Sequence, residues 1–345
     1  MTKSMNRRDL MKTAAGVGLG FASVVRLQAQ APDSIPTWKR ELRQLAPNVY
    51  AYMLGGGPGQ LAQGVSNAGL IVAEDHLMAL DSTGAPIHAK GFLAAARQAV
   101  PDKQFRRLIL THHHGDHIWG LPFFPKMEVI SHEYCRQAML AMDVPAGSVW
   151  EKREGFAEGG EPRKIIPPTT TLTQRATYYI GDMRLEVIPM IPAHTFGDLM
   201  IYLPQHKILF AGDVGFFWAA PFLNNGVATK WIEACDKILD MDVDVIVPGH
   251  GPIGAKKDLA AMREYLRYMK GEARLRYNAG MTVGRACADI KLGKYASWIG
   301  ADDRMPMNLV RLYAEFAGTL TPDFDAAGVA RAAEEYAAVR KSLSH

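Results

Sequence analysis

Short apolar runs alternate with polar turn segments along the first 250 residues, the pattern expected of strands in a mixed α/β chain. Residues 65–73 and 77–80 are predicted as strands. Further strands are predicted at 108–110, 127–130, 185–191, 199–203, 208–211 and 243–247. Residues 90–100 and 229–239 instead carry helical spacing. The elements before about residue 170 are roughly echoed between about 180 and 250, so we expect two halves packed face to face.

The pattern changes after residue 255, where helical spacing dominates. Leu259, Met262, Leu266 and Met269 follow one another at spacings that place them on one face of a helix. Residues 306–316 and 326–343 are predicted as further helices. We expect these helices to cover the core of the same domain rather than to form a separate functional domain.

The first 31 residues have the order of an export signal. Arg7 and Arg8 precede an apolar, Gly/Ala-rich stretch at 13–25, and Ala29-Gln30-Ala31 then offers a small-x-small cleavage site. The apolar run is too short to span a hydrocarbon core of about 30 Å, which disfavours an uncleaved anchor. We therefore predict three parts: a twin-arginine-type signal at 1–31, the main domain at 32–255, and a helical extension of that domain at 256–345. The expected location is the periplasm.

Charge and cysteine content exclude several classes of function. Five of the 39 basic and one of the 35 acidic residues lie in 1–31, so the net charge of +4 belongs to that segment. The remainder has no net charge and no basic run, which argues against a nucleic-acid partner. The three cysteines are scattered and form no Cys-x-x-Cys pair. They allow at most one disulfide and do not support a thiolate zinc site.

Seven potential metal ligands are placed near the ends of predicted strands. Four lie within six residues and three follow later: His112, His114, Asp116, His117, His194, Asp213 and His250. Imidazole and carboxylate groups suit zinc, iron or manganese. A pair of neighbouring metals needs about six or seven protein ligands with one shared, so this set is large enough for two divalent ions.

The spacing within the first cluster predicts how its side chains are divided. In an extended segment alternate residues point the same way, so His112 and His114 can hold one ion while His113 faces elsewhere. Gly115 lets the backbone turn, and Asp116 with His117 then reaches a second ion. Four such groups buried without a metal would be costly, which favours a metal site over a structural histidine cluster.

These residues resemble the recurring motifs of the metallo-β-lactamase superfamily, over roughly residues 45–255. Asp81, in Leu80-Asp81-Ser82-Thr83, matches a carboxylate that supports the ligands, and the seven ligand candidates match the other motifs. The resemblance implies an αββα sandwich. It also implies one metal on His112, His114 and His194 and another on Asp116, His117 and His250, with Asp213 bridging both.

The resemblance implies a periplasmic, dinuclear zinc-dependent hydrolase that attacks an ester, lactone, thioester or related bond with a metal-bridging hydroxide. Asp116 or Asp213 would hold or relay the proton. An aspartate at position 213 is less typical of true β-lactamases, so β-lactamase activity is less expected. No Gly-x-Ser-x-Gly elbow is present in the sequence, so serine-nucleophile chemistry has no support.

Two other functions remain open. One is an iron-dependent redox enzyme on the same fold, and the other is a metal-bearing accessory protein of a periplasmic quinoprotein oxidation pathway. The expected partner is a small-molecule substrate, with no stable membrane anchor after signal cleavage, and a homo-oligomer stays open. Phe216, Phe217, Trp218 and Phe222 could form either an apolar wall of the site or part of the core.

Overall fold

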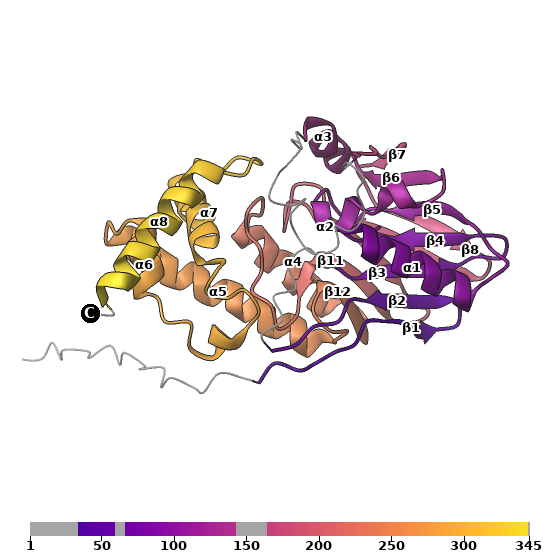
Figure 1. Ribbon diagram of the computed structural model, residues 1–345, viewed down its shortest axis with the longest axis horizontal. Coiled ribbons are helices and arrows are strands. Elements are labelled where there is room, and N and C mark those ends of the chain that lie inside the picture. Colours follow the sequence, from indigo (N-terminus) through magenta and orange to yellow (C-terminus); the bar gives the residue numbers. More distant parts are fainter. Residues whose placement is uncertain (1–33, 59–65, 143–163, 344–345) are drawn as a thin grey trace, which may run out of the picture. The chain divides into compact units, whose positions relative to one another are not determined.

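A seven-stranded sheet is formed by the first half of the chain in this computed structural model, which describes residues 34–58, 66–142 and 164–343 (Figure 1). Its strands lie in sequence order: β1 (Glu41–Ala46), β2 (Val49–Met53), β3 (Ala68–Val72), β4 (Leu77–Leu80), β5 (Phe105–Ile109), β6 (Glu128–His132) and β7 (Thr170–Leu172). The first four strands pair antiparallel and the last four pair parallel. The parallel strands therefore end at a common edge, where their loops meet.

A five-stranded sheet follows in the second half. Its order is β12-β11-β10-β9-β8, made of β8 (Ala176–Ile180), β9 (Met183–Pro189), β10 (Leu199–Leu203), β11 (Ile208–Phe216) and β12 (Val245–His250). One buried cluster joins Ile71 and Ile109 of the first sheet to Leu199 and Ile208 of the second. The two sheets therefore pack face to face, as the repeated pattern of strands predicts.

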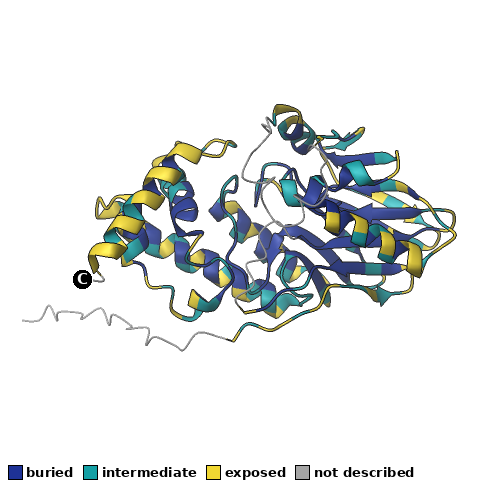
Figure 2. Ribbon diagram, in the orientation of Figure 1, coloured by how far each residue is buried: buried dark blue, intermediate teal, exposed yellow. Residues whose placement is uncertain are grey.

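Helices cover the outer face of each sheet. On the first sheet, Phe92 of α1 (Pro86–Ala99) shares a buried cluster with Leu108. On the second, Trp231 of α4 (Ala228–Asp240) and Met262 of α5 (Lys256–Asn278) pack with Leu209. The short helices α2 (Gly115–Ile118), η1 (Leu121–Phe123) and α3 (Glu133–Ala141) follow β5 and β6. The result is the expected αββα sandwich, with buried residues concentrated along the strands (Figure 2).

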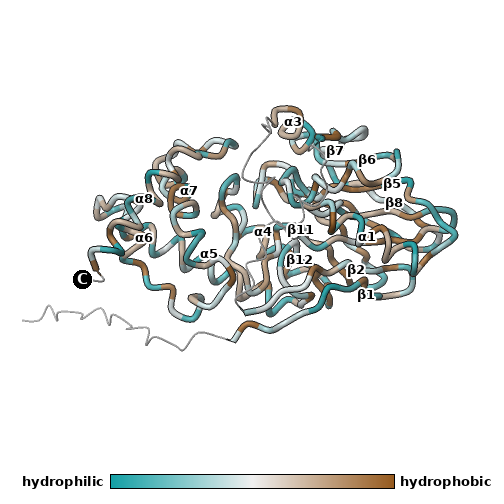
Figure 3. The backbone as a smooth tube through the Cα atoms, in the orientation of Figure 1, coloured by the Kyte–Doolittle hydropathy of each residue, from teal (hydrophilic) through white to brown (hydrophobic). Residues whose placement is uncertain are grey.

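The C-terminal residues form further helices: α6 (Val283–Asp289), η2 (Gly293–Ser297), α7 (Met305–Ala317) and α8 (Ala326–Leu343). Leu309 and Leu312 of α7 belong to the same buried cluster as Trp231, and Pro32–His345 forms one compact unit. The extension therefore shares the core of the second sheet. Figure 3 shows hydrophobic stretches along the strands and hydrophilic ones at the turns.

Three sequence predictions concern the export signal, a membrane anchor and a disulfide. The export signal at 1–31 lies outside them. Within them, no helix is both long and apolar enough to cross a membrane. Cys135, Cys235 and Cys287 are all buried and free, so the one disulfide that the sequence allows does not form.

One expectation about the strands is wrong. The sequence pattern places Asp213 after the end of its strand, but β11 continues to Phe216. The reason is the parallel neighbour β12, which pairs with β11 as far as Phe216 and His250 through two register shifts. Asp213 therefore lies inside a buried strand and not on a loop.

Candidate metal centre

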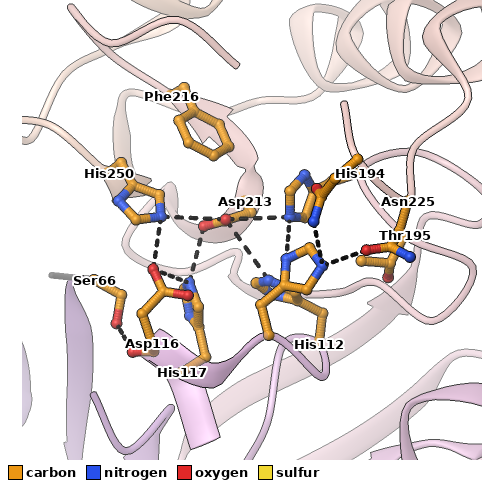
Figure 4. A network of polar contacts seen from close by, with 12 residues as sticks. Ser66, His112, Asp116, His117, His194, Thr195, Asp213, Phe216, Asn225 and His250 are labelled. Carbon is orange, nitrogen blue, oxygen red and sulfur yellow. Dashed lines mark hydrogen bonds and ion pairs between the residues drawn. The ribbon is translucent and has the colours of Figure 1, made fainter. Parts of the chain in front are cut away.

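The seven ligand candidates meet at the edge of the sandwich where β5, β9, β11 and β12 end or pass (Figure 4). His112 and His114 follow β5, while Asp116 and His117 lie in the short helix α2. The other three come from the second half of the chain: His194 follows β9, Asp213 lies within β11 and His250 ends β12. All seven come together from both halves of the fold.

Four of these side chains form a first cluster, made of His112, His114, His194 and Asp213, with one potential ligand atom each and all within 4.8 Å of one another. His194 Nε2 lies 2.8 Å from His114 Nδ1 and 3.2 Å from Asp213 Oδ2. His112 Nε2 is 3.6 Å from the same carboxylate oxygen. Three imidazoles and one carboxylate therefore converge on one point.

The other three form a second cluster, made of Asp116, His117 and His250, whose ligand atoms also lie within 4.8 Å of one another. His250 Nε2 is 3.2 Å from Asp116 Oδ2. Asp213 also faces this cluster, with Oδ1 3.0 Å from His117 Nε2 and Oδ2 3.2 Å from His250 Nε2. Asp213 is thus in contact with both clusters.

Burial and charge at the clusters suit metal ions. His112 Nε2 is buried and has no hydrogen-bond partner among the described residues, an arrangement that needs an explanation in a folded protein. Burial lowers the pKa of His112 and His194 well below the usual range, so both rings are neutral and can offer a lone pair. Burial opposes ionisation of Asp213, but the imidazoles of His250 and His117 hold its pKa well below the usual range.

Asp81 supports the site from behind. Its carboxylate accepts hydrogen bonds from the Thr111 amide (2.7 Å) and hydroxyl (2.8 Å), and lies 2.7 Å from His117 Nδ1. His117 Nδ1 is the nitrogen opposite to the one that faces Asp213. A carboxylate on this outer nitrogen fixes the ring and makes it a better ligand.

Several supporting residues carry no signal in the sequence pattern. Asn225 Oδ1 lies 2.9 Å from His114 Nε2. Asp198 accepts hydrogen bonds from the Thr195 amide and hydroxyl at 2.8 and 2.6 Å, which holds the turn that carries His194. Burial raises the pKa of Asp198 to about 7. Asn225 lies 111 positions from His114, so no local pattern could have indicated that contact. Asp198 is three positions from Thr195, and only its polar character just before a strand could have indicated its role.

The aromatic segment after Asp213 belongs mainly to the core. Phe216 and Phe217 are fully buried, and the Phe216 ring stacks on His250 with centroids 4.6 Å apart. Trp218 and Phe222 are half-buried, and the Arg304 guanidinium lies 4.2 Å from the Phe222 ring centroid. Phe216 therefore acts as packing beneath a ligand candidate.

Several known proteins are similar to this chain in sequence. A linear primary-alkylsulfatase of Pseudomonas sp. (strain ATCC 19151) is 22% identical over 65% of this chain and 49% of its own length. An acyl-coenzyme A thioesterase of Gallus gallus is 28% identical over 46% of this chain and 61% of its length. The chain thus spans about half the length of the alkylsulfatase that it matches.

A similar fold is found among solved structures. A stereoselective inverting sec-alkylsulfatase from Pseudomonas sp. superposes with a TM-score of 0.60 and 18% identity, covering 81% of this chain and 50% of that one. The family model described as the metallo-beta-lactamase superfamily matches residues 61–250, the span that carries both sheets' central strands and all seven ligand candidates. With this match over more than half of its residues, the chain belongs to the metallo-beta-lactamase superfamily.

Proposed function

We propose that this protein is a metal-dependent hydrolase that uses two divalent ions, one at each cluster. The observation that carries the proposal is the position of Asp213. Its two oxygens lie 3.0–3.6 Å from His117, His250, His194 and His112, which come from both clusters. A carboxylate in this position can be shared between two metals. Zinc is the proposed metal, as the family resemblance implies, and the imidazole and carboxylate ligands fit it.

The two carboxylates of the site and the aromatic residue Phe216 have different proposed roles. Bound divalent ions would supply Lewis acidity and activate water for attack. Asp213 is only 3% exposed, so its role is to fix the position of the two clusters relative to each other. The Asp116 side chain is 18% exposed and Oδ2 faces His250, so Asp116 is the carboxylate that can exchange a proton with a leaving group. Phe216, which is buried and stacks on His250, helps to keep the floor of the site dry.

The proposed substrate is a small molecule with an ester, thioester, lactone or sulfate-ester bond. Ester, lactone and thioester bonds are what the family resemblance at Asp213 implies. The thioester is supported further by the likeness to the acyl-coenzyme A thioesterase, and the sulfate ester by the likeness to the linear primary-alkylsulfatase.

A substrate panel tests this proposal. The metal-loaded protein is assayed against alkyl sulfates, acyl thioesters, lactones, simple esters and β-lactams, with metal content measured on the same sample. We expect turnover of at least one of the first four classes, abolished by chelation and restored by zinc. If the protein holds two metals but cleaves none of these four classes of substrate, the proposed hydrolase function is contradicted. Visible-region absorbance and iron content would then favour the redox alternative.

We also propose that the protein is exported to the periplasm by the twin-arginine route, on the basis of Arg7, Arg8 and the apolar stretch that follows. Replacing both arginines by lysine should keep the protein in the cytoplasm with its signal uncleaved. The matched control replaces Lys3 and Lys12 by arginine, which preserves charge and should leave export intact. Periplasmic maturation of the Arg7→Lys/Arg8→Lys variant would contradict the proposal.

A further inference from the structure

Helix α7 presents a buried polar face, which a helix that only covers a core does not need. Arg304 at its N-cap, followed by Asn308, Arg311 and Glu315, repeats at four, three and four residues, so these side chains lie on one side of the helix. Arg304 and Arg311 are each 6% exposed and Asn308 is fully buried. Burying such groups is costly unless they are paired, so their partners show what this face does.

Most of the partners are backbone groups of one segment, residues 220–229, which follows β11 and runs into the start of α4. Arg304 donates to the Ala220 carbonyl, and Asn308 donates to the Pro221 carbonyl (3.0 Å) and accepts from the Leu223 amide (3.0 Å). Arg311 Nε donates to the Gly226 carbonyl (2.7 Å). Arg311 Nη1 also donates to the Asp323 carbonyl (3.2 Å). Glu315 accepts from the Ala228 and Thr229 amides at the start of α4. The polar face therefore holds the whole segment in place.

The same segment touches the first metal cluster. Asn225 Oδ1 lies 2.9 Å from His114 Nε2, and Asn225 Nδ2 donates to the Pro322 carbonyl at 2.8 Å. The Val227 amide donates to the Ala193 carbonyl at 2.9 Å, next to His194. Gly226 packs closely here, because a Cβ at this position would lie 2.9 Å from the Ala193 carbonyl oxygen.

Donor and acceptor roles settle the direction of the Asn225 contact. The Pro322 carbonyl can only accept, so the Asn225 amide nitrogen faces it and Oδ1 faces His114. His114 Nδ1 points at His194 and the first cluster, so the ring proton sits on Nε2 and donates to Asn225. This arrangement presents a bare Nδ1 to a metal, and an acceptor on the outer nitrogen strengthens it as a ligand.

We propose that Asn225 is a positioning residue for His114, and that the polar face of α7 keeps Asn225 in place. The C-terminal extension would then set the metal affinity of the first cluster. This inference rests on the proposed metal-dependent function. The second cluster is supported from elsewhere: Asn67 donates to the Pro248 and Gly251 carbonyls on either side of His250. Each cluster can therefore be disturbed separately.

The first experiment measures metal binding without any substrate. Asn225→Ala should lower affinity at one of the two sites by about 10–100-fold and change the visible spectrum of the cobalt-substituted protein. Asn225→Asp keeps an acceptor for His114, so it should restore much of the metal affinity and of the cobalt spectrum. Asn67→Ala should weaken the other site instead. The His250→Ala variant leaves only the first cluster intact. Adding Asn225→Ala to this variant must still lower the metal affinity.

Asn224→Ala is the matched control for the neighbouring amide. Asn224 Nδ2 lies 3.5 Å from His114 Nε2, but two donors cannot bond to each other, so this variant should keep affinity within about two-fold. An equal loss in Asn224→Ala would overturn the proposal, as would unchanged affinity and spectrum in Asn225→Ala.

The second experiment tests the link to α7. Arg311→Met should lower affinity at the same site, with an effect that does not add to that of Asn225→Ala, because both act through one segment. Arg276→Met is the control, since Arg276 pairs with Glu272 and Asp289 away from the site. Equal losses in both variants, or full additivity, would overturn the role of α7. If Arg311→Met does not fold, Asn308→Asp, which keeps the acceptor for Leu223 but loses the donor to Pro221, replaces it.

These readouts separate the inference from the proposed function. A protein that binds two metals and responds to Asn225→Ala but hydrolyses nothing would contradict the hydrolase and leave the positioning role standing. A protein that binds two metals and hydrolyses a substrate, but whose metal affinity does not change in Asn225→Ala, would support the hydrolase and contradict the positioning role.

Discussion

At the scale of single residues, neighbouring histidines in one loop have different surroundings. His114 lies in the first cluster, whereas His113 is buried beside Tyr134 with ring centroids 6.1 Å apart and belongs to neither cluster. The alternation of an extended segment explains the difference, because successive side chains point to opposite sides.

We expect His114→Ala to lose most of the metal of the first cluster and to reduce turnover at least about a hundred-fold, because the change removes a ligand. His113→Ala should keep both metals and lose only stability, since it leaves a cavity among buried side chains. Elemental analysis with thermal unfolding distinguishes the two variants. Equal metal loss in both variants would contradict the assignment of His114, and not His113, as a ligand.

Asp213 is the residue on which the dinuclear arrangement depends. Asp213→Asn keeps the shape but removes the charge that faces four imidazoles. We expect the second divalent ion to bind roughly a hundred-fold more weakly, because a neutral amide no longer offsets two dications. Calorimetric titration should then show one tight site in place of two. Two tight sites with full activity would exclude a shared carboxylate.

At the scale of elements, β11 and β12 bring Asp213 and His250 together by pairing in parallel beyond the point where the apolar pattern ends. This close approach depends on Gly249 of β12, where a Cβ would overlap the Asp213 carboxylate. Sequence periodicity cannot show such a contact, because it depends on the shifted register of two strands.

We therefore expect Gly249→Ala to displace the Asp213 carboxylate and to weaken metal binding by at least about ten-fold. Gly215→Ala is the matched control in β11, where the new Cβ would lie 3.2 Å from the Pro248 side chain and away from the carboxylate. Metal affinity near normal in Gly249→Ala, or equally reduced in both variants, would show that the strand contact does not set the carboxylate's position.

At the scale of the whole molecule, the candidate site joins both sheets and the C-terminal helices. Ligand candidates come from residues 112–117, which run into helix α2, from the loop at 194 and from strands β11 and β12. Helix α7 holds the segment that carries Asn225. Bound metals should therefore stabilise the fold as a unit, and not one loop alone.

Chelation tests this coupling. Metal that binds only the folded state stabilises it by about 2.7 kcal/mol per site when free metal is a hundred times its dissociation constant. We expect chelation to lower the melting temperature by several degrees and zinc to restore it. The His114→Ala/His250→Ala variant should respond much less. An unchanged melting temperature in the unsubstituted protein would contradict the coupling between the site and the fold.

The sequence by itself determined the type of fold and the chemistry of the candidate site. Alternating apolar runs predict strands 199–203 and 77–80 where β10 and β4 lie, and helical spacing predicts 326–343, where α8 lies. The seven ligand candidates are recognisable because imidazole and carboxylate chemistry is a property of the side chain, and the cluster at 112–117 is local.

Only the tertiary structure decided how those groups face one another. Asp213 was expected at the end of a strand, and its place inside β11 follows from pairing with β12. Asn225 and His114 are 111 positions apart, and the polar face of α7 meets its partners 84–87 positions away. Apolar periodicity records which side of an element is buried, but not which polar groups meet there, because those contacts depend on how distant elements pack.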